Sequence, residues 1–198
     1  GWYYPWLLYR LALDGTVPPI VPGDPTIKTE TPVVSLLATL TDKSDEARPQ
    51  PVTAAPELAY DDQTGQRMVF VPTGRLLHAT DSSTPVKDSI WALADHSLGT
   101  PSTRANVSVC AITVADDVRT SSCTGGVATA RGWVMDLPDA GERINVAPIV
   151  QLGTLIFVSN TPTSTDVCEG KGESFLYYLD ISNGGALPAS PGGKVGEA

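Results

Sequence analysis

The stretch Ser174-Phe175-Leu176-Tyr177-Tyr178-Leu179-Asp180-Ile181-Ser182-Asn183-Gly184-Gly185 decides the fold class of this chain. Its aromatic and aliphatic run is typical of a β-strand, because such side chains pack well on a pleated, half-buried surface. The run stops at Asp180 and continues into Asn-Gly-Gly, which accept the positive φ angles of a tight hairpin turn. Strands closed by such turns are the units of β-propellers. We therefore expect an all-β scaffold that presents a rigid binding surface rather than a reaction centre.

The rest of the chain repeats this alternation of short strand and turn. Glycine (18) and proline (17) are frequent among the 198 residues, which leaves little room for long helices. The segment 84–96 fits a helix or a strand, and we favour a strand. The other segments expected to contain strands are 2–13, 33–40, 51–60, 67–71, 107–114, 126–135, 144–152, 154–159 and 174–180. Loops are expected at 16–32, 41–50, 115–126 and 160–173.

This pattern amounts to about ten to twelve strands, or about four blades of a β-propeller. Because a ring of four blades is uncommon, we expect a partial propeller that further residues complete. The apolar segment 2–9 lacks the flanks of a signal peptide and suggests a buried strand of a longer protein. Three regions follow: an N-terminal strand and Pro-rich loop (1–32), the propeller segment (33–186) and a Gly/Pro-rich tail (187–198).

The charge balance argues against two classes of partner. Thirteen basic and 22 acidic residues give a net charge of −9, without a cluster of Lys and Arg. Nucleic acids and anionic lipids both need concentrated positive charge, so neither is expected to bind. No run approaches the ~18 apolar residues of a membrane span, so we expect no transmembrane segment.

The three cysteines show no C-x-x-C spacing, which leaves a zinc site and a thioredoxin motif without support. Cys110 and Cys123 flank an expected hairpin and are candidates for a disulfide. Cys168 would then be free or bonded to a cysteine outside the chain. Three buried thiols are the alternative.

Three motifs follow one another at similar spacing between about residues 33 and 186. The first joins Pro56-Glu57-Leu58-Ala59 to Met68-Val69-Phe70-Val71-Pro72-Thr73-Gly74-Arg75-Leu76-Leu77. The second joins Arg131-Gly132-Trp133-Val134-Met135-Asp136-Leu137-Pro138 to Gly141-Glu142-Arg143. The third runs from Leu155-Ile156-Phe157-Val158 through Asp166-Val167-Cys168 to Lys171-Gly172-Glu173-Ser174 and Leu176-Tyr177-Tyr178-Leu179-Asp180. Together they resemble the C-terminal domain of PilY-type proteins, the tip-associated biogenesis factors and adhesins of type IV pili.

The resemblance implies a quinoprotein-like β-propeller that reaches the pilus tip or the outer cell surface through the periplasm. It implies roles in pilus assembly, opposition to retraction and surface adhesion. The implied partners are minor pilins, the remainder of the same propeller, and a host or abiotic surface. Family members often carry a D-x-[DN]-x-D-G-x-x-D calcium loop, which is not found here, and no other cofactor is identified. Pro72 replaces the usual glycine before Thr73-Gly74, which rigidifies that turn.

The polar loops supply the candidate sites. Asp42, Asp45 and Glu46 are the candidate metal ligands, but their loop lacks the glycine turn of a calcium loop, so we favour a solvated loop. Loops held on a rigid scaffold are the usual place for binding residues. The candidate interface residues are Asp42, Lys43, Asp45, Asp116, Asp117, Thr163, Asp166 and Lys171.

Catalysis is not expected. The two histidines, His78 and His96, accompany neither a G-x-S-x-G elbow nor an H-E-x-x-H motif. The function that the resemblance implies is that of a structural and binding component of a type IV pilus tip. Two alternatives are a quinoprotein-like dehydrogenase remnant, which would retain a bound quinone, and a free-standing secreted binding propeller, which would be a stable monomer.

Overall fold

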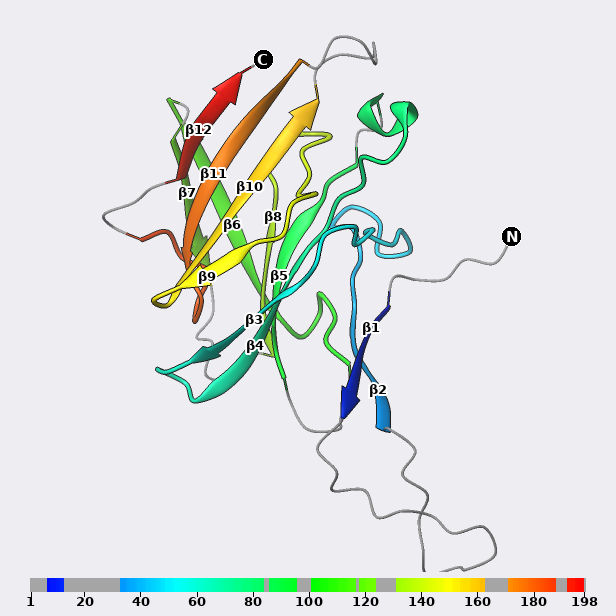
Figure 1. The fold of residues 1–198 in the computed structure, drawn as a ribbon, viewed down its shortest axis with the longest axis vertical. Helices are drawn as coiled ribbons and strands as arrows, with labels where there is room; N and C mark the ends of the chain where they lie inside the picture. The colour runs from blue at the N-terminus through cyan, green and yellow to red at the C-terminus, as the bar shows by residue number, and fades with distance from the viewer. Residues whose placement is uncertain are drawn as a thin grey trace, which may run out of the picture.

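The computed structural model describes residues 7–12, 33–83, 86–95, 101–116, 118–123, 131–162, 171–187 and 192–197. Strands dominate these residues, and their one helical element is the 3₁₀ turn η1 (Ala79–Ser83) (Figure 1). The prediction of an all-β fold is confirmed. The strands are β1 (Leu7–Ala12), β2 (Val33–Thr39), β3 (Glu57–Asp61), β4 (Gln66–Pro72), β5 (Ser89–Ala94), β6 (Ser108–Ala115), β7 (Val118–Cys123), β8 (Gly132–Asp136), β9 (Ile149–Gln151), β10 (Thr154–Pro162), β11 (Gly172–Asp180) and β12 (Gly192–Glu197).

Ten of these strands form one curled sheet in the order β3-β4-β5-β8-β6-β7-β12-β11-β10-β9. Each end of the order is a four-stranded antiparallel set: β3-β4-β5-β8 and β12-β11-β10-β9. The antiparallel hairpin β6–β7 joins the two sets. The sheet curls far enough that its two edge strands, β3 and β9, lie next to each other. Strands β1 and β2 pair with each other as a separate antiparallel sheet.

The count of about four blades differs from what the described residues form. They contain two four-stranded sets and one hairpin within a single sheet. The hairpin does not begin a sheet of its own, because β6 pairs in parallel with β8 over three residues and β7 pairs with β12 over two. Strand number alone could not predict this insertion.

The main hydrophobic core lies inside the curled sheet. Alternate residues of each strand point into it, as the two-residue period of a strand requires. Trp133 is fully buried there and donates its Nε1–H to the Ile181 carbonyl at 3.0 Å. This bond holds the turn after β11, where Gly184 has a φ of +69° and a Cβ would lie 2.7 Å from the Trp133 ring. The turn that Asn-Gly-Gly predicts therefore has a packing reason as well as a conformational one.

A second core covers the outward face of β4, β5 and β8. Strand β5 is buried along its whole length, so this part of the sheet is covered on both faces. The cover comes from the end of β2 and the residue that follows this strand, because Ala38 and Leu40 belong to the same buried cluster as Trp91. The cluster consists of Ala38, Leu40, Val71, Trp91, Leu93, Val107 and Val134.

Several local predictions meet different outcomes. The strand favoured within 84–96 is confirmed by β5. The loop expected at 115–126 is wrong over its described part, because β6 extends to Ala115 and β7 runs from Val118 to Cys123. Of the strand expected at 144–152, only the residues of β9 are a strand. At the start of that segment, the Ile144 amide donates to the Thr73 carbonyl at 3.0 Å, next to the end of β4. The segment expected to be a tail, 187–198, contributes β12 to the sheet.

Candidate functional site

The loop 41–50 forms one wall of an open cavity of about 640 Å³. Backbone hydrogen bonds fasten both ends of the loop: Asp42 N–H donates to the Arg48 carbonyl at 3.0 Å, and Gln50 N–H donates to the Leu40 carbonyl at 3.1 Å. The loop is therefore a fixed feature of the surface. The described lining residues are Thr39, Thr41, Asp45, Glu46, Ala47, Arg48 and Pro49. We call this feature the loop 41–50 groove.

Asp42 is a structural residue of this loop rather than an exposed ligand. Its carboxylate is buried and accepts hydrogen bonds from the Ser44 amide (2.7 Å) and the Ser44 hydroxyl (2.6 Å). Burial opposes its ionisation, but these bonds and the Arg48 guanidinium, 3.3 Å away, hold the pKa of Asp42 below its usual range. Asp45 and Glu46 are exposed. In the part of the chain that the structure describes, no group of three or more His, Cys, Asp or Glu is arranged to hold a metal ion.

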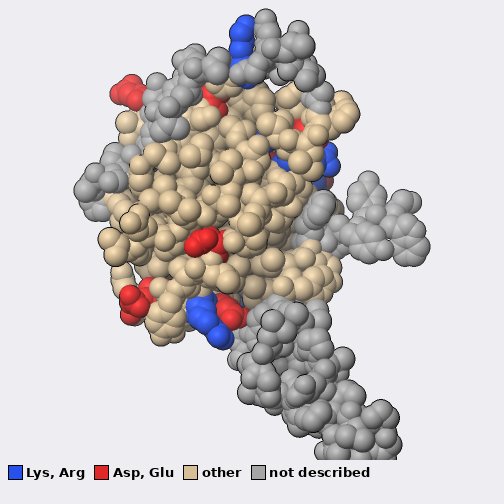
Figure 2. Space-filling view, in the orientation of Figure 1, with Lys and Arg blue, Asp and Glu red and all other residues tan. Residues whose placement is uncertain are grey.

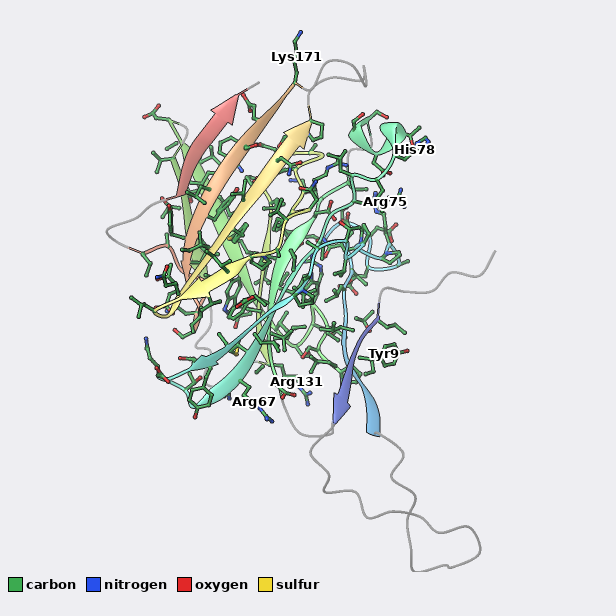
Figure 3. The ribbon with its side chains drawn as sticks, viewed as in Figure 1. Tyr9, Arg67, Arg75, His78, Arg131 and Lys171 are labelled. Carbon is green, nitrogen blue, oxygen red and sulfur yellow. A yellow bond between two sulfur atoms is a disulfide. The ribbon has the colours of Figure 1, made fainter. Side chains whose placement is uncertain are left out.

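The other candidate interface residues are spread over the molecule. Lys43 is exposed on the loop 41–50. Asp116 lies in the β6–β7 turn with a φ of +48°. Lys171 stands at the outer end of β11 (Figure 3). Asp117, Thr163 and Asp166 lie outside the described residues, as do His96 and Cys168.

Three buried polar junctions hold the sheet together, and the first lies in the main core. Glu142 is fully buried and pairs with Arg119, with 2.5 Å between Oε1 and Nη1. The same oxygen accepts hydrogen bonds from the hydroxyls of Ser159 and Tyr177. Arg119 also pairs with Asp139. Burial, and next the Glu142 charge, raise the pKa of Tyr177 far above its usual range, so this phenol stays protonated.

The second junction lies on the outward face of the sheet. Arg104 and Asp136 form a buried ion pair with two hydrogen bonds, of 2.6 Å and 3.2 Å. Ser89 donates to Asp136 at 2.7 Å and accepts from Arg104 at 3.0 Å. Gln50 donates to the Ser89 hydroxyl and accepts from the Trp91 indole, both at 2.8 Å. This network ties the loop 41–50 groove to the sheet.

The third junction joins the end of β4 to the segment before β9. Gly74 has a φ of +147°, and a Cβ there would lie 2.7 Å from the Arg143 Cβ and 2.8 Å from the Ile144 amide. Arg143 is buried and donates to the Gly141 carbonyl at 2.9 Å. Burial raises the pKa of nearby Asp88 to about 6, against the attraction of the Arg143 charge.

Each junction contains residues of the three sequence motifs: Gly74 from the first, Asp136, Glu142 and Arg143 from the second, and Tyr177 from the third. Sequence reasoning did not assign them this role. The signal that was available is the presence of charged residues beside an apolar strand motif, since buried charges occur in proteins mainly when paired. Their burial makes them suited to fixing the fold rather than to meeting a substrate.

The structure places Cys110 and Cys123 directly opposite each other on β6 and β7 and joins them in a disulfide. Since the two strands are consecutive, the bond closes a short hairpin. It lies against the Gly184 turn, where a Cβ would be 2.9 Å from the Cys123 Sγ.

The exposed basic side chains that Figure 3 labels, all within the described part of the chain, do not gather into one patch. Arg67 and Arg131 lie at the end of the sheet opposite Lys171, and Arg75 lies with His78 beside η1 (Figure 3). His78 is exposed, and its Nδ1 is 3.0 Å from the Thr80 hydroxyl. Among the described residues, no helix has the length and hydropathy to cross a membrane.

The curled all-β fold places the chain in a class of protein domain. Comparison with known proteins confirms its resemblance to the C-terminal domain of PilY-type proteins. In structure, the chain is similar to the crystal structure of the Pseudomonas aeruginosa PilY1 C-terminal domain, a β-propeller, with a TM-score of 0.56 and 18% identity. The similarity covers 77% of this chain and 36% of that one.

Two curated relatives come from Xylella fastidiosa (strain Temecula1 / ATCC 700964), and each is named type IV pilus biogenesis factor PilY1 homolog. They are 29% and 28% identical over 154 and 149 residues, or 72% and 69% of this chain. The matched regions span only 12% and 10% of the relatives' own lengths. No family model matches the chain.

Proposed function

We propose that the chain is part of a PilY-type protein of the type IV pilus machinery and acts there as a structural and binding component. The observation that carries the proposal is the similarity over 154 residues to a type IV pilus biogenesis factor PilY1 homolog. Residues of the three sequence motifs take part in each of the buried junctions, so the motifs include side chains that hold the fold together. The relatives are named as biogenesis factors, and we propose no catalytic role for the chain.

The finer role that we propose is at the pilus tip, outside the cell, after passage through the periplasm. There the chain would promote pilus assembly and surface adhesion by binding minor pilins and a host or abiotic surface. The mechanism is presentation: a loop that the scaffold already holds loses little conformational entropy when a partner binds.

The loop 41–50 groove is the proposed minor-pilin contact. Its loop is fastened at both ends by backbone bonds and below by the junction of Gln50, Ser89 and Trp91. Asp45 and Glu46 are exposed beside the cavity, so the groove offers negative charge to a polar or basic segment of a pilin.

The test of the overall role is an in-frame deletion of residues 33–186 in the producing bacterium. We expect surface pili and pilus-dependent motility to be lost, and to return when the segment is restored. Normal piliation and motility in the deletion strain would refute the proposed function.

The test of the groove is a charge reversal with a matched control. Glu46→Lys should lower the recovery of minor pilins with the purified protein by about fivefold or more, since like charges across an interface suppress association. Asp62→Lys makes the same charge change on an exposed turn away from the groove and should leave recovery unchanged. Equal recovery with both variants would exclude the groove as the contact while leaving the pilus role open.

A further inference from the structure

The turn between β9 and β10 places a leucine in an unfavourable backbone conformation. Gln151 and Thr154 are paired, so Leu152 and Gly153 are the two residues of a hairpin turn. Their φ angles are +50° and +74°. A two-residue turn with positive φ at both positions strongly prefers Asn-Gly, Asp-Gly or Gly-Gly, because in this conformation a Cβ approaches a backbone oxygen. Leu152 therefore adds strain to the turn.

A second turn of the molecule shows the usual way of meeting this requirement. Asp116, in the β6–β7 turn, is the other described residue that has a positive φ and is not a glycine, with a φ of +48°. Aspartate tolerates such a φ because its short polar side chain can form hydrogen bonds with the nearby backbone. The side chain of Leu152 has no polar atom that could form such a bond.

Leu152 does not offset this strain by burial. It is 97% exposed, the largest exposed fraction of any large hydrophobic residue in the described part of the chain. A Cβ on the neighbouring Gly153 would meet nothing within 4 Å, so the turn stands clear of the other described residues. An exposed leucine alone is ordinary on a protein surface. Exposure together with backbone strain has no explanation in folding, and such strain is found at functional sites.

The structure also fixes the position of this turn. Strands β9 and β10 are paired up to the turn, and the Gly153 carbonyl accepts a hydrogen bond from the Ile181 amide at 3.1 Å. Figure 1 shows the turn at the left side of the sheet, at the tip of the β9–β10 hairpin. A side chain held on such a scaffold loses little conformational entropy when a partner binds.

The hairpin offers a partner apolar contacts and no charge. The chain has no charged residue from position 144 to position 165. Val146 and Ile149, which lie just before the turn, are 56% and 54% exposed. Figure 2 shows few charged side chains over β9 and β10, which face the viewer in this orientation. The surface that matches this hairpin is therefore uncharged and apolar.

We propose that Leu152 is a contact residue that inserts into an apolar pocket of a neighbouring protein in the pilus. A fixed, protruding side chain fits a concave site. A flat apolar surface or a lipid would accept an apolar residue on an unstrained turn equally well, so neither explains the strain. The inference rests on the proposed function for the assembly in which the contact is made.

The test replaces Leu152 by asparagine in the complete polypeptide, made in the producing bacterium. Leu152→Asn supplies the preferred Asn-Gly turn, so the Tm of the purified polypeptide should rise by about 2 °C. Its recovery with sheared native pili should fall by about tenfold or more, the factor that burial of one leucine side chain supplies. Leu58→Asn is the control, since Leu58 is 71% exposed on β3 without a positive φ. It should neither raise the Tm nor change the recovery.

Three results of this experiment would overturn the proposal. A raised Tm with unchanged recovery would mean that Leu152 is strained without being a contact. A lowered Tm would mean that Leu152 stabilises the fold. Absence of the parent polypeptide from the pili would contradict the proposed function and this inference together. The parent alone shows that last result, so the two failures are distinguishable.

Thiol labelling separates a neighbouring protein from other covers of the turn. Leu152→Cys, in a Cys168→Ser background, should react with a maleimide at least about tenfold more slowly in pili than in the purified polypeptide, since reactivity follows exposure of the thiol. Slow reaction of the purified polypeptide at every concentration would mean that its own residues cover the turn. Slow reaction only at high concentration, with a doubled mass in light scattering, would indicate a second copy. Protection by phosphatidylcholine vesicles would indicate a lipid, and each of these three results would overturn the proposal.

Discussion

The substitution Glu142→Gln removes one negative charge from the interior of the sheet and keeps the shape of the side chain. Glu142 is fully buried, and its partner Arg119 has a side chain that is 1% exposed. After the substitution, the Arg119 charge keeps only Asp139, whose side chain is 49% exposed and therefore well screened by solvent. Removing one partner of a buried ion pair costs about 3–5 kcal/mol, because the other charge stays buried. Since Asp139 remains, we expect the lower value, about 3 kcal/mol of unfolding free energy.

Thermal and urea unfolding, followed by circular dichroism, measure this loss. In a domain of this size 1 kcal/mol shifts the Tm by about 2–4 °C, so the variant should melt about 6–12 °C below the parent protein. Glu46→Gln makes the same chemical change on an exposed loop and should shift the Tm by less than about 1 °C. A loss below about 1 kcal/mol for Glu142→Gln would refute the conclusion that this junction stabilises the fold.

Three further predictions concern single positions. Gly132→Ala should lower the free energy of unfolding in urea by about 4 kcal/mol or more, because a Cβ would lie 1.9 Å from a backbone carbonyl oxygen of β5. Gly153→Ala is the control: a Cβ there meets open space, so the loss should be about 1 kcal/mol. Because burial raises the folded-state pKa of Asp88 to about 6, above the unfolded value, stability should fall as the pH rises from about 4 to about 6, and urea titrations of Asp88→Asn should lack this fall. Reducing the Cys110–Cys123 disulfide should lower the free energy of unfolding by about 2–4 kcal/mol, measured by urea unfolding with and without reductant. An unchanged urea midpoint would contradict the pairing.

The sequence predicted those parts of the fold that depend on short-range signals. Apolar runs of strand length located β4, β10 and β11, and Asn183-Gly184-Gly185 located a turn. Register within consecutive hairpins follows from the turn between them, as the pairing of β10 with β11 illustrates. The motif order was sufficient to find the PilY-type resemblance.

Long-range pairing was not predictable in this way. Strand β6 pairs in parallel with β8, and β12 pairs with β11. The local sequences of these segments contain no signal that indicates which strand each one pairs with. The same holds for the pairing of Arg119 with Glu142, 23 positions apart. Asp42 was misread as exposed for a related reason: polar loops usually face solvent, but this carboxylate is buried by its own turn and by Arg48.

Cross-linking mass spectrometry of native pili that contain this chain tests the pilus assignment most directly. We predict cross-links from Lys43, which is exposed on the loop beside the loop 41–50 groove, to minor pilins. We also predict cross-links from Lys171 to further residues of the same polypeptide. If the chain cross-links to no pilin component in pili that are otherwise intact, the fold stands and the proposed role in type IV pilus biogenesis is contradicted.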